Sequence, residues 1–240
     1  MPAPHSDSRR AFLAGAATLF IAGCAGLPTG ASGPPVPAPA YAVGDRWVYR
    51  ARDGFLSPTT WEETHEVTAV GPQGITVRVT QRGPAVNVMR TEVLSSPGHV
   101  RVGAVFDDET RRFTQDLLRY DFPLESGKSW NQWVHNVNET VRREGDLNRY
   151  VRVGGWRKIQ TPAGTFDAIG LWVVMHLDDD EFWRERTDCR YEIWYAPAVN
   201  AAVREEKEAQ YFEKSGKMDT GPIRSQHALV ELVAYTPAAR

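Results

Sequence analysis

The cysteine at position 24 is the residue whose surroundings point most directly to a chemical reaction. It follows Ile21, Ala22 and Gly23, which end an apolar run over residues 11–23 that is too short to cross a bilayer as a helix. An aliphatic residue, two small residues and a cysteine are typical of a bacterial lipoprotein signal. We therefore predict a signal peptide over residues 1–23 and acylation of the Cys24 thiol by a fatty acid such as palmitate. The alternative is an ordinary secretory signal that contains a cysteine.

Two consecutive arginines precede the apolar run. Arg9 and Arg10 are followed by Ala11, Phe12 and Leu13, an arrangement typical of a twin-arginine export signal. A basic segment also begins the signals of the general secretory route. We predict the twin-arginine route and keep the general route as the alternative.

The rest of the sequence lacks the common catalytic motifs. It contains no G-x-S-x-G elbow, no Walker loop and no G-x-G-x-x-G, and its histidines are not spaced like metal ligands. The acidic run over residues 178–181 lacks the spacing of a calcium loop. Cys189 lies in the middle of an expected strand, where a lone cysteine is usually a small buried apolar residue rather than a nucleophile. We therefore predict no catalytic residue, no metal site and no cofactor.

The charge of the chain excludes one class of partner. Without residues 1–23, which hold Arg9, Arg10 and Asp7, 217 residues remain, with 28 − 2 = 26 basic and 30 − 1 = 29 acidic side chains and a net charge of −3. A chain this close to neutral creates no strong field for nucleic acid, so we predict no nucleic-acid partner. Its length suits one domain.

The elements that follow are mainly strands. Residues 24–40 are rich in Gly, Pro and Ala, so we expect a tether between the lipid and a domain over residues 41–240. In the domain, apolar and polar residues alternate, for example over residues 75–79 and 228–234, and short Gly/Pro turns separate the runs. Many strands with short connections favour an antiparallel sheet.

The expected fold class is mainly β: a single curved antiparallel sheet, half-barrel or sandwich-like, with one or two short helices. Residues 108–120 place Phe113, Leu117 and Tyr120 at helical spacing after acidic residues, which predicts a helix. Residues 201–214 contain many helix formers without an apolar stripe. There we predict an exposed strand, with a helix as the alternative.

The expected strand over residues 166–177 is apolar on both faces. Val173 and Met175 lie on an aliphatic face, and Trp172 lies on the opposite one. Such a strand is usually covered on both sides, by a core and a helix. Alternatively, one face lines an apolar cavity, in which case Trp172, Val173 and Met175 are the candidate ligand-binding residues.

Four short motifs together resemble a family of bacterial secreted proteins and lipoproteins sometimes called TapB-like. They are VGDRWVY at 43–49, FPL at 122–124 with GKSW at 127–130, TPAGTFDA at 161–168 and WYAP at 194–197. The resemblance implies an antiparallel β-rich domain, related to the LolA-like half-barrel of lipoprotein carriers, and it implies no catalytic residue. The sequence departs from the pattern at Asn200, where such relatives often have glycine.

These observations predict a cell-envelope lipoprotein that is a non-enzymatic binding or assembly module for an apolar ligand. The alternative is a structural or protein-interaction lipoprotein without a small ligand, and an enzyme is the third hypothesis. The expected partners are the membrane, through the lipid anchor, and a lipid or another envelope protein. Ala25 follows the cysteine in place of the aspartate that often retains lipoproteins at the inner membrane, so we expect the periplasmic face of the outer membrane.

Overall fold

The computed structural model describes residues 30–106, 108–179, 181–214 and 221–239. Cys24, Arg9 and Arg10 lie outside these residues. Twelve strands make up almost all of the described chain: β1 (Arg46–Asp53), β2 (Thr59–Gly71), β3 (Gly74–Arg82), β4 (Asn87–Ser96), β5 (His99–Ala104), β6 (Thr110–Leu118), β7 (Ser129–Asn138), β8 (Arg143–Thr161), β9 (Gly164–Asp179), β10 (Thr187–Ala196), β11 (Ala201–Tyr211) and β12 (Ile223–Thr236).

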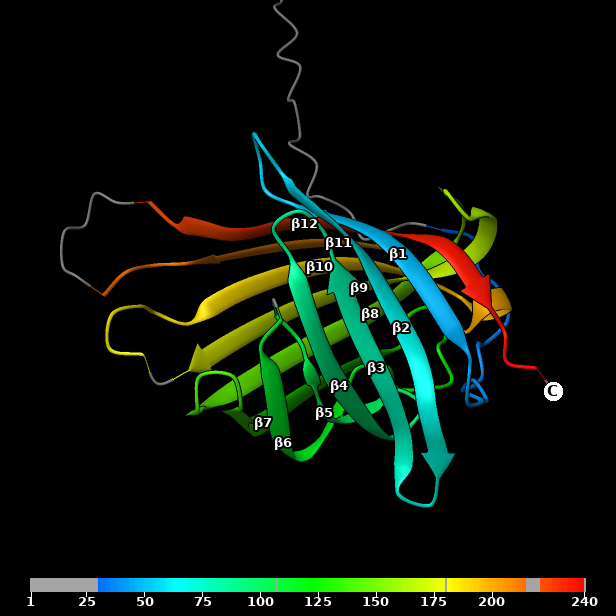
Figure 1. The fold of residues 1–240 in the computed structure, drawn as a ribbon, viewed down its shortest axis with the longest axis horizontal. Helices are drawn as coiled ribbons and strands as arrows, with labels where there is room; N and C mark the ends of the chain where they lie inside the picture. The colour runs from blue at the N-terminus through cyan, green and yellow to red at the C-terminus, as the bar shows by residue number, and fades with distance from the viewer. Residues whose placement is uncertain (1–29, 107, 180, 215–220, 240) are drawn as a thin grey trace, which may run out of the picture.

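The strands form a closed antiparallel barrel in which each strand pairs with its neighbours in sequence (Figure 1). The first and last strands close it, from Arg46 opposite Thr236 to Asp53 opposite Ala228. The expected antiparallel arrangement is confirmed, but the expected open half-barrel or sandwich is wrong. Closure pairs both edge strands, so that neither is left with a row of unpaired N–H and C=O groups.

The predicted helix over residues 108–120 is also wrong, because that segment contains β6. Phe113 and Leu117 are four residues apart, and this spacing fits both one face of a helix and one face of a strand. Arg111, Phe113 and Leu117 are all buried, at positions an even number of residues apart. The strand predicted from residue 201 onwards is confirmed as β11.

None of the helices in the described residues is long and apolar enough to cross a membrane. A 3-10 turn over Pro197–Val199 separates β10 from β11. Asn200 ends this turn with φ 55°, in the left-handed region. Asparagine tolerates this conformation better than most residues. The turn therefore forms although the glycine of the TapB-like pattern is missing.

Part of the expected tether lies against the barrel. Backbone hydrogen bonds join Ala31 to Trp156 and Val36 to Leu124 in both directions. Val36 is buried within one of the apolar clusters of the barrel. The described residues from 30 to 40 are thus attached to the barrel at two points.

The wall contains a weakly paired seam between β6 and β7. Backbone pairing there covers only three positions, from Arg111 opposite Asn138 to Phe113 opposite Asn136. Beyond them side chains bridge the strands: the Gln132 amide accepts a hydrogen bond from the Leu118 N–H at 2.8 Å and donates one to the Asp116 carbonyl at 2.9 Å. Trp130 Nε1 donates to the Leu118 carbonyl at 3.1 Å.

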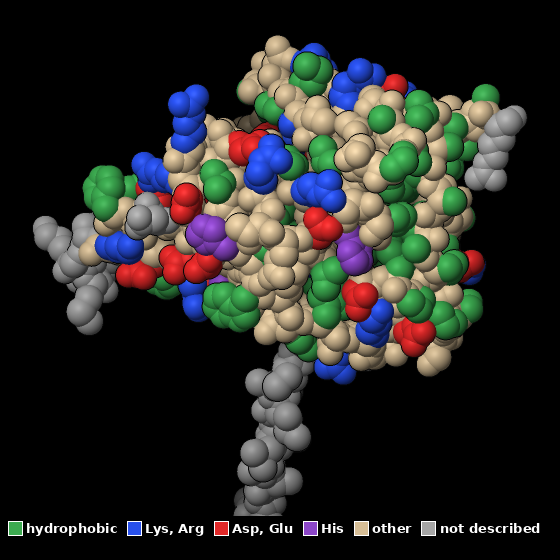
Figure 2. Space-filling view, turned by 90° about the horizontal axis from the view of Figure 1, so that it is seen from below, with side chains coloured by type: hydrophobic (Ala, Val, Ile, Leu, Met, Phe, Trp, Pro, Cys, Tyr) green, Lys and Arg blue, Asp and Glu red, His purple; other side chains and the backbone are tan. Residues whose placement is uncertain are grey.

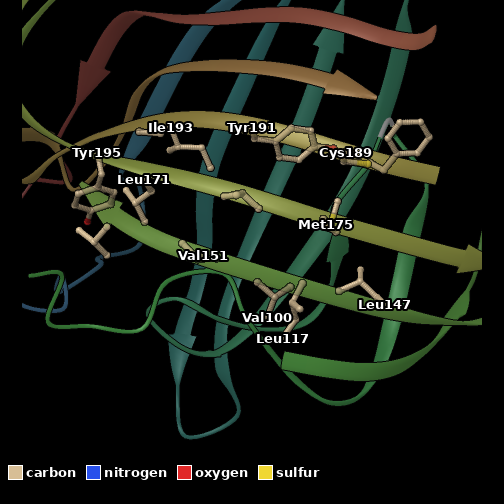
Figure 3. Close-up of a cluster of buried hydrophobic side chains, with 14 of the residues drawn as sticks. Val100, Leu117, Leu147, Val151, Leu171, Met175, Cys189, Tyr191, Ile193 and Tyr195 are labelled. Atoms are coloured by element: carbon tan, nitrogen blue, oxygen red, sulfur yellow. The ribbon is translucent and has the colours of Figure 1, made fainter. Parts of the chain in front are cut away.

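Two apolar clusters occupy the interior. The larger joins side chains of β5 to β11. Figure 3 shows several of them projecting from neighbouring strands, including Leu171, Met175, Tyr191 and Ile193. The smaller joins residues of β1 to β4 and β9 to β12, among them Trp47, Val67 and Leu232.

Candidate functional site

A cavity of about 170 Å³ separates the two apolar clusters inside the barrel. Met175 and Ile193 contribute to its wall from the larger cluster, and Trp47, Val67 and Leu94 contribute from the smaller one. Charged or ionisable side chains complete the wall: Glu63, His65, Arg90, Glu92, Arg119, Arg149, Glu205 and Lys207. The interior therefore combines apolar surface with buried charge.

Strand alternation explains how charged residues come to face inward. On β11, Glu205 and Lys207 share the two-residue period of buried Ala209. On β8, Arg149 lies between buried Leu147 and Val151 in the same period. A strand of this kind places its charged residue in the barrel rather than in water.

Most of these charges form a connected set of ion pairs. Glu92 lies 2.9 Å from Arg119 and 3.5 Å from Arg90, and the Arg90 guanidinium also lies 3.8 Å from Glu63. His65 Nε2 lies 2.5 Å from Glu63 Oε1. On the strand β11, Glu205 and Lys207 pair at 2.6 Å. Each carboxylate in the wall thus has a basic partner.

The pairing sets the ionisation of Glu92 and Glu63, the two more deeply buried carboxyl groups of the wall. Burial by itself would raise the pKa of Glu92, but the charges of Arg119 and Arg90 outweigh it and lower the pKa to about 2. Burial also acts to raise the pKa of Glu63, and the hydrogen bond and charge of His65, together with Arg90, hold that pKa well below its ordinary value. Both groups are therefore anionic at neutral pH.

Arg149 differs from the other basic residues of the wall. It is 5 % exposed, and among the described residues no carboxylate lies within ion-pair distance of it. Its Nη1 donates to the Leu118 carbonyl at 2.8 Å. Burial lowers the pKa of Arg149 to about 10, because the nearby groups that favour the charged form do not fully offset desolvation. It is a desolvated cation without a counter-ion in the described chain.

A second polar group in the wall also lacks a partner. The Tyr195 hydroxyl is buried and makes no hydrogen bond with the described residues. Its ring packs edge-on against Tyr120 and Phe122, with centroid distances of 5.3 and 5.6 Å. Burial raises the pKa of Tyr195 above its ordinary range, so the hydroxyl keeps its proton as a donor.

The structure separates the three candidate ligand-binding residues. Met175 lines the cavity, whereas Val173 is packed in the larger apolar cluster and is not part of the wall. Trp172 alternates with them on β9 and is only half-buried, on the opposite face of the sheet. Whether any of them binds a ligand stays a prediction.

Sequence reasoning missed the charged residues of the wall. A signal was present in the run Leu147-Asn148-Arg149-Tyr150-Val151, where an arginine shares the two-residue period of aliphatic neighbours. The chemistry of the wall is that of binding and charge pairing. In the part of the chain that the structure describes, no three His, Cys, Asp or Glu side chains cluster as metal ligands. Cys189 is buried on β10 within the larger cluster.

Solved structures with a similar fold come from bacteria. A candidate exported protein with a YmcC-like fold from Bacteroides fragilis gives a TM-score of 0.53 at 13% identity, covering 84% of this chain and 99% of that one. A candidate lipoprotein from Parabacteroides distasonis gives 0.50 at 15% identity, covering 84% and 97%. The hypothetical lipoprotein YmcC of Escherichia coli gives 0.43 at 8% identity, covering 81% and 86%.

No family model matches the chain, and no curated protein matches it. The TapB-like resemblance remains a prediction, and the closed barrel contradicts the LolA-like half-barrel that it implied. The first two structural likenesses establish the fold: this chain folds as a barrel like the YmcC-like protein of Bacteroides fragilis.

Proposed function

We propose that this protein is a cell-envelope lipoprotein that acts without catalysis and binds a small ligand with an apolar part inside its barrel. The observation that carries the proposal is the cavity between the two apolar clusters. Native interiors are usually packed to the density of organic crystals, with few voids larger than a water molecule. Closed antiparallel barrels use such space to hold one small ligand.

The size of the cavity limits the ligand. A dry cavity of roughly 150 Å³ lined by aliphatic and aromatic residues can hold benzene. The cavity of about 170 Å³ therefore suits a ligand of similar or slightly greater bulk, and a whole phospholipid is too large for it. Met175, Ile193 and Val67 offer such a ligand apolar contacts from opposite sides.

The envelope location has two supports. The Ile-Ala-Gly-Cys sequence at 21–24 is typical of a lipoprotein signal, and two proteins of similar fold are described as a candidate exported protein and a candidate lipoprotein. We place the anchored protein on the periplasmic face of the outer membrane, after export by the twin-arginine route. Cys24→Ser should release the protein from the membrane fraction or leave an unprocessed precursor.

The binding proposal is tested by filling the cavity. The probe is 1-octanol, titrated calorimetrically into the full-length chain carrying Cys24→Ser. In the same background, Met175→Trp should abolish octanol binding and change the melting temperature little, because the added ring enters free space. Val173→Trp should instead overpack the cluster and cost about 1–3 kcal/mol of stability. Absence of octanol binding to the unblocked protein would contradict the proposal, as would unaltered binding to a folded Met175→Trp variant.

A second candidate function, a protein-interaction lipoprotein without a small ligand, is favoured by exposed apolar side chains at one end of the barrel. Leu56 and Phe182 are almost fully exposed, and both lie in connections from an odd-numbered to an even-numbered strand, which share one end of an up-and-down barrel. Figure 2 shows hydrophobic side chains projecting among charged ones at the left-hand end, where Figure 1 places the β9–β10 and β11–β12 connections. Where exposed apolar side chains gather into a larger patch, they often mark a contact site for a partner.

That alternative predicts a different result. A photo-crosslinker at Phe182 should then capture the same envelope protein in repeated experiments, and one at exposed Val70, at the opposite end, should not. Octanol should not bind in the barrel.

A further inference from the structure

The charges that line the cavity do not balance. Three carboxylates, on Glu63, Glu92 and Glu205, face four cations that are charged at neutral pH: Arg90, Arg119, Arg149 and Lys207. The wall therefore holds more cations than carboxylates. Each carboxylate lies within 4 Å of at least one basic side chain. Among the described residues, the cation left over is Arg149.

The position of Arg149 makes this surplus costly. A guanidinium has five N–H donors, and the Leu118 carbonyl is the only acceptor that the described residues offer it. A buried charge without a partner is strongly destabilising unless something compensates it. Arg149 borders the free space of the cavity, so a bound anion could reach the donors that remain.

The register places apolar surface directly beside this cation. Arg149 on β8 is opposite Met175 on β9. Leu117 and Ile193 also line the cavity and belong to the same apolar cluster as Met175. A ligand with one negative charge and an apolar chain therefore fits this part of the wall. Its charge would lie on Arg149, and its chain would pack against the neighbouring apolar side chains.

We propose that the ligand is a medium-chain carboxylic acid, with its carboxylate on the Arg149 guanidinium and its chain against Met175, Leu117 and Ile193. This inference rests on the proposed binding function and adds the chemical class of the ligand. Among the described residues, Arg149 is the wall cation without a carboxylate within ion-pair distance, so one negative charge completes its pairing. A headgroup with two negative charges would leave one of them next to the carboxylates of the wall.

The experiment compares headgroups on one chain length. Octanoate, octyl phosphate and 1-octanol are titrated calorimetrically at neutral pH into the full-length chain carrying Cys24→Ser. Octanoate should bind at least about tenfold more tightly than 1-octanol, because charge-assisted hydrogen bonds are stronger than neutral ones. Octyl phosphate should bind more weakly than octanoate.

Substitutions of Arg149 test whether this residue causes the preference for octanoate over 1-octanol. Arg149→Gln should weaken octanoate binding and reduce the octanoate-to-octanol preference to within about twofold of equality, whereas Arg149→Lys should keep a preference for octanoate. The matched control is Arg152→Gln, three residues along the same strand and exposed on the outer face. A purely structural role of Arg149 would lower the affinity for both ligands equally.

The outcomes separate the two proposals. If neither octanoate nor octanol binds, the proposed function fails. If both bind equally to the protein with Arg149 intact, the cavity binds apolar ligands and the carboxylate inference is overturned. Tighter binding of octyl phosphate would also overturn it. If Arg149→Gln does not fold, the test rests on the octanoate-to-octanol affinity ratio of the protein with Arg149 intact and of the Arg149→Lys variant.

Discussion

Glu92 is a carboxylate held almost entirely out of water between two guanidinium groups. It is 3 % exposed, and Arg119 and Arg90 both lie within ion-pair distance. A buried pair of this kind often contributes little net stability compared with apolar residues, yet the loss of either partner is costly. Its clearest effect is therefore on the way stability changes with pH.

We predict acid destabilisation that depends on Glu92. Its folded pKa of about 2 lies below the ordinary value of 4.5, so its contribution is fully present above pH 4.5 and is lost as the pH falls towards 2. The loss is on the order of 3 kcal/mol for this group. Urea unfolding between pH 7 and pH 2.5 should show a smaller fall in the free energy of unfolding for Glu92→Gln than for the unaltered protein.

The control for this measurement is Glu62→Gln, an exposed carboxylate on β2. It should leave the pH dependence close to that of the unaltered protein. An identical fall in all three proteins would show that Glu92 is not held anionic by its partners.

At the scale of elements, the seam between β6 and β7 is a part of the wall with few paired backbone positions. Gln132 takes the place of a strand neighbour there, with bonds to the backbone of Leu118 and Asp116. The carbonyl of Leu118 also accepts bonds from Trp130 and Arg149. Arg149, which borders the cavity without a carboxylate partner among the described residues, thus also helps to hold the seam.

We predict that Gln132→Ala opens the seam locally. The change removes both side-chain bonds to β6, each worth about 0.5–1.5 kcal/mol, so the amide proton of Leu118 should exchange roughly 5–100 times faster. Hydrogen exchange followed by NMR or mass spectrometry measures this directly. Gln160→Ala, at an exposed position of β8, is the control and should leave the exchange unchanged. Equal exchange in the two variants would mean that other contacts hold the seam.

At the scale of the whole molecule, closure depends on strands that lie about as far apart in sequence as the chain allows. β1 pairs with β12 over the whole length of β1. In an open sheet these two strands would lie at opposite edges. Their proximity therefore distinguishes the closed barrel from every half-barrel arrangement.

We predict that a disulfide forms across the closing pair. Arg50 and Glu231 face each other between β1 and β12, and directly opposed positions of antiparallel strands have the Cα separation that a disulfide requires. Arg50→Cys with Glu231→Cys, in a Cys24→Ser background, should oxidise to an intramolecular bridge seen as a mobility shift without reductant.

Two further cysteine pairs serve as the positive and the negative control. Arg50→Cys with Glu62→Cys joins β1 to its sequence neighbour β2, and it should bridge in either fold. Arg50→Cys with Gln160→Cys connects strands that are not neighbours and should not bridge. If only the β1–β2 pair forms, the sheet is open.

The sequence predicted the strands better than their arrangement. Alternation located β3 and β12 because each shows its buried face within a few residues. Local alternation does not predict closure of the barrel, because closure depends on the pairing of residues 46–53 with residues 228–236. The same limit applies to the cavity. The apolar face of its strand predicts Met175, but sequence alone does not predict Arg149, because a single charged position in a strand usually points to water.

The attachment of residues 31 and 36 to the barrel would shorten the reach of a lipid anchor on Cys24. Had residues 24–40 been a free spacer, the barrel could have moved as far as roughly 60 Å from an acylated Cys24. With Ala31 bonded to Trp156, only seven Cα-to-Cα steps separate the anchor from a fixed point on β8, which limits the reach to about 25 Å. A lipidated form would hold the side of the barrel near Trp156 close to the bilayer, so the same face would meet the membrane in every copy.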